Sequence, residues 1–162
     1  MNDDEPLIRP AAEDDLDAVQ ALLRETWHQV YDAILGAEKV DEVTARWHDR
    51  ALLARELRQA HSSFLVACAD GEVVAHGFAY LRDPATLVVS RLYVRPTHQR
   101  RGIGARLFAT MRARHAGAQT VRLFAAADNT AGLAFWRGAG FAVAGEGIEE
   151  GARVLHLEKR LG

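Results

Sequence analysis

Apolar side chains recur at every third or fourth position in four stretches of the chain, and this spacing predicts helices. In the first stretch, Leu16, Val19, Leu22 and Leu23 fall on one face, behind acidic residues that suit a helix N-terminus. The four predicted helices run from Asp14 or Asp15 to about Tyr31, from about Val40 to Ala60, from Gly102 to about Ala116, and from Asp128 or Asn129 to near Gly138. Two helices are therefore expected early in the chain and two late.

Between the helices, short runs of apolar and β-branched residues predict strands. These runs are Leu7–Arg9, Ser63–Ala69, Val73–Leu81, Thr86–Val94, Thr120–Ala125, Phe141–Ala144 and Arg153–Glu158. Asp70 and Gly71 predict a tight hairpin, and Pro96 ends a strand because proline cannot donate to the ladder. No repeat or linker divides the chain. We therefore expect a single domain over residues 1–162 of the α/β class (α+β type), with a mixed, largely antiparallel central sheet of about six or seven strands flanked by four helices.

Charge is distributed unevenly along the chain. The net charge is −2, yet residues 84–127 contain eight arginines and no Asp or Glu, so the remainder carries about −10. The eight are Arg91, Arg95, Arg100, Arg101, Arg106, Arg112, Arg114 and Arg122. Glycines and helix-core positions interrupt them, whereas nucleic-acid binding calls for an exposed basic stripe with stacking aromatic residues. We therefore expect a local anion site and no nucleic-acid partner.

Other features exclude several classes of protein. A single cysteine, Cys68, rules out an intramolecular disulfide, and its apolar neighbours indicate a core residue. The seven histidines form no HxxxH pair and there is no CxxC, so no metal site is expected. Residues 1–5 are acidic and lead into no apolar segment, and no stretch is long enough to span a membrane. These features favour a cytoplasmic protein that does not associate with a membrane.

The most informative segment joins a strand to a helix through paired glycines, and reads LYVRPTHQRRGIGARL from Leu92 to Leu107. The first amides of a helix lack partners and form an anion site, and Gly102 and Gly104 let an oxyanion approach the backbone closely. The surrounding mobile charges are Arg95, Arg100, Arg101 and Arg106. A ligand with several phosphates suits this arrangement. The spacing fits neither the dinucleotide fingerprint GxGxxG, because Leu107 replaces the third glycine, nor a P-loop.

Two elements in this order resemble the GNAT superfamily of N-acetyltransferases. Gln99-x-x-Gly102-x-Gly104, after a strand that ends Leu-x-Val-x-Pro, is similar to the acetyl-CoA pyrophosphate loop of that family. The segment NTAGLAFWRGAGF, from Asn129 to Phe141, is similar to the family pattern N-x-x-A-x-x-F-Y-x-x-x-G-F, with Gly132 at the usual alanine. The short Ile-Arg strand and the Asp-rich helix entry also fit. The resemblance covers nearly the whole chain and implies a GNAT-like sheet.

The resemblance implies acetyl-CoA as co-substrate and no metal. The pantetheine arm would lie beside the strand that ends at Val94, where a backbone amide would polarise the thioester carbonyl. The implied cofactor-binding residues are Leu92, Tyr93, Val94, Gln99, Arg100, Arg101, Gly102, Ile103, Gly104, Ala105, Asn129 and Trp136. A primary amine would then attack directly in a ternary complex. It must first lose a proton, because only about one in a thousand lysine-like amines is neutral at pH 7.

Structural roles compete with several of these assignments. Asn129 suits a helix N-cap as well as a cofactor contact, and both roles are compatible. Gly102 and Gly104 also suit a plain tight turn. Phosphate contact is the interpretation favoured for Arg100 and Arg101. For three arginines further along the chain, a solvated surface position is favoured. These are Arg112, Arg114 and Arg122.

The sequence departs from the family at the catalytic positions. The tyrosine that protonates the leaving sulfur aligns with Trp136, whose indole has no useful acidic proton. Residues 87–92 also lack the carboxylate that some members use as a base. The catalytic residues are therefore unassigned, and each substitute also has an ordinary structural role. The substitutes considered are Tyr93, Tyr31, Asp83, Tyr80 and His76.

The acceptor is expected to be a small-molecule or peptide amine. Trp27-x-x-x-Tyr31 resembles a feature of the acceptor site in some members, including bacterial polyamine acetyltransferase-like proteins, although helix packing explains it equally well. Acidic residues follow at Glu38, Asp41 and Glu42, so a cationic acceptor is the first hypothesis. Dimers are common in the family, which leaves a homodimer open. The alternative function is a non-catalytic acyl-CoA-binding or sensing module, motivated by the missing tyrosine and carboxylate.

Overall fold

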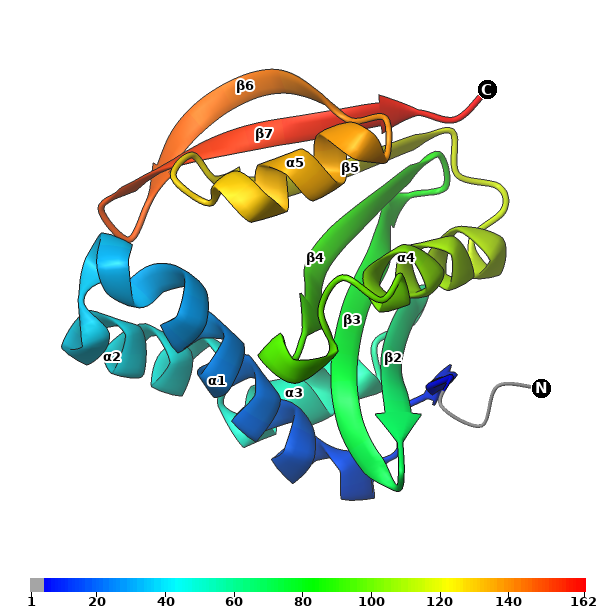
Figure 1. Cartoon of the computed structure of the whole chain (residues 1–162). Coiled ribbons are helices and arrows are strands. Elements are labelled where there is room, and N and C mark those ends of the chain that lie inside the picture. The colour runs from blue at the N-terminus through cyan, green and yellow to red at the C-terminus, as the bar shows by residue number, and fades with distance from the viewer. Residues whose placement is uncertain (1–4) are drawn as a thin grey trace.

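The computed structural model describes residues 5–162, and residues 1–4, on which much of the expectation about a secretion signal rests, lie outside this range. Within it, seven strands form one sheet in the order β1-β2-β3-β4-β5-β7-β6 (Figure 1). The strands are β1 (Leu7–Pro10), β2 (Ser62–Ala69), β3 (Glu72–Asp83), β4 (Thr86–Val94), β5 (Thr120–Ala126), β6 (Ala142–Glu149) and β7 (Ala152–Arg160). Neighbouring strands are antiparallel except β4 and β5. The mixed, largely antiparallel sheet is confirmed.

The described residues contain five α-helices, one more than predicted. They are α1 (Leu16–Leu35), α2 (Ala37–Trp47), α3 (Arg50–Leu57), α4 (Ile103–Arg114) and α5 (Thr130–Gly138), with short 3-10 turns at Glu13–Asp15 and Pro96–His98. The single helix expected from about Val40 to Ala60 is wrong, because the backbone is extended at Asp49. The break has a packing reason. Val43 of α2 is buried beside Trp27 of α1, whereas Leu53 of α3 is buried against the sheet, and the two sites need different helix axes.

The sixth strand also differs from the prediction. It was expected to end at Ala144 and instead continues to Glu149 through Gly145 and Gly147. Two glycines in a strand weaken the sequence signal because they supply no side chain to the alternating pattern. The longer β6 pairs with β7 over almost its whole length, and the resulting hairpin turns at Glu150 and Gly151, which both have positive φ.

The helices cover the two faces of the sheet unequally, as Figure 1 shows. Helices α4 and α5 pack on one face, where Leu107 and Leu133 join the largest apolar cluster. Helices α1 and α3 pack on the other face against β2 and β3, where Leu23 and Leu53 contact Phe78. On that second face, β5, β7 and β6 carry no helix among the described elements, and Phe124 of β5 is 62% exposed. Half of one face of the sheet is therefore bare.

Strands β4 and β5 separate soon after they meet. Their pairing is confined to residues 86–88 of β4 and 120–122 of β5. Beyond Val88, β4 pairs only with β3, and β5 pairs only with β7. Ser90 is an extra residue in β4, because Phe78 pairs with Arg91 whereas Ala79 pairs with Val89. Such bulges redirect the backbone and occur often beside active sites. From Val89 to Val94, one edge of β4 therefore has no neighbouring strand.

A buried ion pair ties β4 to α3 directly after the bulge. The side chain of Arg91 is only 6% exposed, and its Nη1 donates to both carboxylate oxygens of Glu56 at 3.1 and 3.2 Å. Its Nε donates to Nε2 of His76 at 3.2 Å, and Nδ1 of His76 in turn donates to the carbonyl of Leu65 at 2.8 Å. The guanidinium also lies 5.0 Å from the ring centroid of Phe78. Both ring nitrogens of His76 are thus engaged, and its imidazole is neutral.

Replacing Glu56 by alanine leaves the Arg91 charge buried without its partner. We expect Glu56→Ala to lower the free energy of unfolding by about 3–5 kcal/mol, the usual cost of breaking a buried pair. Urea denaturation measures this. The matched control is Glu13→Ala, whose pair with Arg58 is exposed on both sides (59% and 69%), so its expected loss is about 0–1 kcal/mol. Equal, small losses in the two variants would contradict the structural role given to the buried pair.

Candidate functional site

The loop between β4 and α4 presents free backbone amides at one end of the unpaired edge. Gly102 is the N-cap of α4 in a left-handed conformation (φ 80°), and Arg100 also has positive φ (63°). The first intrahelical bond runs from the amide of Arg106 to the carbonyl of Gly102 at 3.1 Å. The amides of residues 103–105 therefore precede the helical ladder and have no acceptor within it. With Gly102 as cap, no side chain occupies this position. This is the geometry of an anion site.

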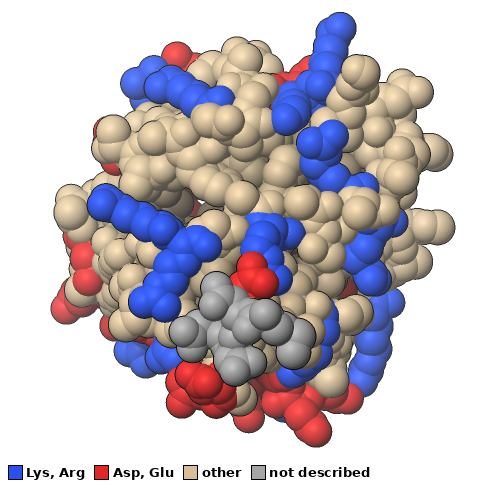
Figure 2. Space-filling view, turned by 45° about the vertical axis from the view of Figure 1, so that its right-hand side comes forward, with Lys and Arg blue, Asp and Glu red and all other residues tan. Residues whose placement is uncertain are grey.

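Two of the predicted phosphate-binding arginines are free to serve that site. Arg100 and Arg101 are exposed, and no carboxylate of residues 5–162 lies within 4.0 Å of either guanidinium. Arg95, expected to be mobile, instead pairs with Glu25 at 3.1 Å and with Glu72 at 3.6 Å. That expectation needs correcting, because partners from α1 and β3 neutralise Arg95. In Figure 2, Lys and Arg spread over the face that carries α4, whereas many acidic side chains gather along the lower edge.

The predicted residues around the loop also have structural roles. The side chain of Gln99 donates to the carbonyl of Val94 at 2.9 Å and to Oε1 of Gln29 at 3.0 Å, so it shapes the loop and anchors it to α1. A Cβ added at Gly104 would lie 3.5 Å from the ring of Phe135 and 3.8 Å from Val94. Gly104 therefore lies where α4, α5 and β4 meet, next to the unpaired edge.

The second motif begins α5 and packs into the core. Oδ1 of Asn129 accepts from the amide of Gly132 at 3.0 Å, so Asn129 is the N-cap. A Cβ at Gly132 would lie 2.5 Å from Nδ2 of Asn129, so an alanine here requires that side-chain amide to shift. Trp136 is 8% exposed and packs edge-on against Phe108 and Phe141, with centroids 5.5 and 5.1 Å away. Cofactor contacts by Asn129 and Trp136 stay predictions.

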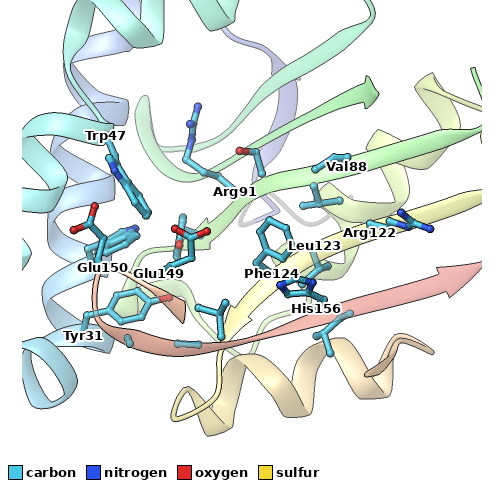
Figure 3. A pocket seen from close by; sticks show the side chains of 18 of the residues that line it. Tyr31, Trp47, Val88, Arg91, Arg122, Leu123, Phe124, Glu149, Glu150 and His156 are labelled. Carbon is cyan, nitrogen blue, oxygen red and sulfur yellow. The ribbon is translucent and has the colours of Figure 1, made fainter. Parts of the chain in front are cut away.

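A cavity of about 800 Å³ lies on the opposite face, above the bare half of the sheet (Figure 3). Tyr31 of α1 and Trp47 of α2 line its helical side, and Phe124 of β5 and His156 of β7 line its strand side. Val88 to Arg91 of β4 also line it, so the cavity reaches the bulge and the start of the unpaired edge. One edge of β4 thus connects the cavity with the loop of free amides.

Most carboxylates in the cavity wall are already paired. Glu56 pairs with Arg91, Glu158 pairs with Arg122 at 3.1 Å, and Glu150 pairs with Arg46 and, at 3.4 Å, with Lys39. Glu149, the fourth, makes no ion pair with a residue in the range 5–162. Figure 3 shows it pointing into the cavity from the β6–β7 hairpin, between Tyr31 and Phe124. It supplies the unneutralised negative charge of the cavity.

The residues considered as catalytic substitutes are dispersed. Tyr31, Tyr93 and Tyr80 line the cavity, and burial raises the pKa of both Tyr31 and Tyr93, so these two hydroxyls stay protonated. His76 is fully buried within the Arg91 network, and that burial lowers its pKa well below the ordinary range. Asp83 lies in the β3–β4 turn, where it accepts from the amide of Ala85 at 2.9 Å, and it does not line the cavity.

Sequence reasoning missed the cavity residues Trp47, Phe124, Glu149 and His156. The acids that it singled out on α2 do not line the cavity, and Asp41 pairs with His28 at 2.8 Å. No local motif marks the missed residues, because they come from separate elements. The one available signal was strand alternation in β7, which places His156 and Glu158 on the same face.

The described residues offer neither a membrane span nor a metal cluster. No helix in them is long and apolar enough to cross a membrane. No group of three or more His, Cys, Asp or Glu side chains in them is arranged to hold a metal ion.

Solved structures show the same fold. PaiA N-acetyltransferase from Thermoplasma acidophilum, in complex with coenzyme A, is 22% identical with a TM-score of 0.87, over 96% of this chain and 99% of that one. Ard1 from Thermoplasma volcanium is 16% identical with a TM-score of 0.78, over 97% and 98%. The ribosomal-protein-S18-alanine N-acetyltransferase from Escherichia coli is 16% identical with a TM-score of 0.71, over 96% and 93%. No curated protein sequence matches the chain significantly.

The family profile described as Acetyltransferase (GNAT) family matches residues 17–141. This range contains all but the first residue of α1, the β4 edge, the loop of free amides and α5. The match covers most of the chain, and the seven-stranded sheet agrees with it. The chain therefore belongs to the GNAT family of acetyltransferases, enzymes that use acetyl-CoA.

Proposed function

We propose that this enzyme transfers the acetyl group of acetyl-CoA to a primary amine held in the cavity, by direct attack in a ternary complex. The observation that carries the proposal is the unpaired edge of β4, which runs from the cavity at Ser90 to the loop of free amides beyond Val94. An extended pantetheine arm needs backbone partners along its length, and an unpaired strand edge offers them. The edge also joins a phosphate site to an acceptor site.

On the cofactor side, the amides of Ile103, Gly104 and Ala105 bind the pyrophosphate, and Arg100 and Arg101 add mobile positive charge. Leu92, Tyr93 and Val94 contribute backbone groups from the free edge. This assignment retains the loop residues expected from the sequence and leaves out Arg95, which is paired. Gln99 contributes mainly by holding the loop in place through Val94 and Gln29.

On the reaction side, the bulge at Ser90 redirects the backbone of β4 beside the opening between β4 and β5. A fixed amide dipole there polarises the thioester carbonyl and stabilises the oxyanion that forms on attack. The thiolate of coenzyme A has a thiol pKa near 8.5 and needs a proton donor only weakly. Because Trp136 packs in the core, we propose that the thiolate leaves without the usual tyrosine.

On the acceptor side, we propose a cationic small amine, polyamine or peptide amine. Aromatic faces of Tyr31, Trp47 and Phe124 surround the unpaired carboxylate of Glu149. Aromatic faces and a carboxylate attract ammonium groups. Trp27 is buried and stacks on Tyr31 at 4.3 Å, so within the W-x-x-x-Y feature Tyr31 alone presents a substantial surface to the acceptor. A cytoplasmic location and a homodimer stay predictions.

A carboxylate placed at Gly104 tests the cofactor side. We expect Gly104→Glu to weaken acetyl-CoA binding at least about 100-fold, because a negative side chain would occupy the helix N-terminus and repel phosphate. Isothermal titration calorimetry measures the affinity. Gly117→Glu, just beyond the other end of α4 where nothing lies within 4 Å of an added Cβ, is the matched control and should retain wild-type affinity. An unchanged affinity in Gly104→Glu would remove the loop from the cofactor site.

Neutralising Glu149 tests the acceptor side. We expect Glu149→Gln to lower kcat/KM about tenfold for an α,ω-diamine, since a charge-assisted contact is worth about 1.4 kcal/mol or more. The monoamine of the same length, which lacks the distal cation, should be affected little. The control is Glu146→Gln on the same strand, whose carboxylate pairs with Arg153 at 2.9 Å and does not line the cavity. Equal losses for diamine and monoamine would argue against a cation subsite at Glu149.

A further inference from the structure

One imidazole stands on the bare face of the sheet. His156 of β7 lies opposite Phe124 of β5 on one side and Gly145 of β6 on the other. Its ring packs on Phe124 with centroids 4.4 Å apart. A Cβ added at Gly147 would lie 3.1 Å from Nε2, and one at Gly145 would lie 3.6 Å from Nδ1. The two glycines of β6 therefore make the space that this ring occupies, and Figure 3 shows the ring in the cavity beside Phe124.

The strand register places His156 on the same cavity as the start of the unpaired β4 edge. The last paired residues of the parallel strands are Val88 and Arg122. Two residues further along each strand come Ser90, at the bulge, and Phe124, and both line the cavity. His156 is the residue paired with Phe124, one strand further from β4. Ser90 and His156 both line the cavity, so an amine bound between them can pass a proton to this imidazole through water.

The one other histidine that lines the cavity and three of its four carboxylates are buried or paired. Burial lowers the pKa of His48 to about 3, which makes it a weak base at neutral pH. The carboxylates of Glu56, Glu150 and Glu158 bind cationic side chains. Glu149 is unpaired, but it follows the Gly145 position by four residues of extended strand, about 13 Å further toward the hairpin turn. Glu149 is thus suited to a distal cation and His156 to the reacting nitrogen.

The charged side chains on the strands beside His156 pair with each other, and its neighbours on β6 are glycines. On β7, Glu158 lies on the same face two residues away, and Arg122 of β5 pairs with it at 3.1 Å, so the two neutralise each other. From β6, the neighbours of the ring are the two glycines. Further along the cavity, Glu149 is an unpaired carboxylate, and Arg82 of β3 is a cation with no ion pair among residues 5–162. A neutral imidazole nitrogen can take a proton from an ammonium group, which suits a general base.

We propose that His156 is the general base of the acetyl transfer, a role that rests on the proposed function. A lone pair of the neutral imidazole takes one proton from the ammonium group of the acceptor, through a water molecule. The freed nitrogen lone pair forms a C–N bond with the thioester carbonyl carbon, and the C–S bond then breaks. Coenzyme A departs as thiolate and receives the second amine proton. The imidazolium releases its proton to solvent, so the products are the amide, the thiol and one proton.

The test compares wild type, His156→Gln and the control His61→Asn. His61 is exposed, lies outside the cavity and has positive φ (55°), a conformation that Asn tolerates. The acceptors are an alkylamine, protonated at neutral pH, and methoxyamine, already neutral there. We expect His156→Gln to lower kcat/KM for the alkylamine about 100-fold at pH 7, and its remaining rate to rise with pH as the amine itself loses its proton, up to an amine pKa of about 10.4. With methoxyamine the loss should shrink to a few-fold. His61→Asn should match wild type.

Acetyl-CoA affinity and the far-ultraviolet circular dichroism spectrum of His156→Gln should be unchanged, which separates a chemical defect from misfolding. Equal losses for both acceptors would overturn the assignment of His156 while leaving the proposed function in place. Failure of wild type to acetylate any amine would instead overturn the proposed function, and the inference with it.

Discussion

The separation of β4 from β5 is the constraint on which the site depends. A parallel pair that continued past Val88 would satisfy the backbone of β4 and close the sheet. Because the strands part, one edge of β4 keeps its donors and acceptors, and the opening leads to the cavity on one face and to the loop of free amides on the other. The bulge at Ser90 and the buried Arg91–Glu56 pair hold β4 in this position. A cofactor that pairs with this edge would complete the sheet locally.

The unequal coverage of the sheet leaves one face free for the proposed acceptor. Helices α4 and α5 bury residues of β5 and β7 such as Leu123 and Leu157 on the cofactor face. Their neighbours in sequence, Phe124 and His156, must then point to the other face, where no described helix covers them. The break between α2 and α3 directs these helices onto α1 and β2, away from β5. A large exposed aromatic residue and an imidazole in a cavity are the consequence.

The parts of the site encoded within a short segment were predictable, and those assembled from distant segments were not. The loop after β4 could be predicted because Gly102, Gly104 and the adjacent arginines carry their meaning in local spacing. Asn129 likewise caps the helix that follows it. Arg95 was misjudged because its partners, Glu25 and Glu72, come from other elements. Glu149 and His156 escaped notice because Gly145 and Gly147 interrupt the alternation of β6, and because tertiary packing alone brings that hairpin to α1 and α2.

The central claim is that one strand edge joins a cofactor site to a working acceptor site. Release of free thiol from acetyl-CoA, followed with and without a panel of primary amines, tests it most directly, with binding of acetyl-CoA measured on the same sample. The account predicts tight binding and thiol release that depends on the amine and saturates with its concentration. Tight binding with no amine-dependent release, for every amine tried, would contradict the account and favour a sensing module.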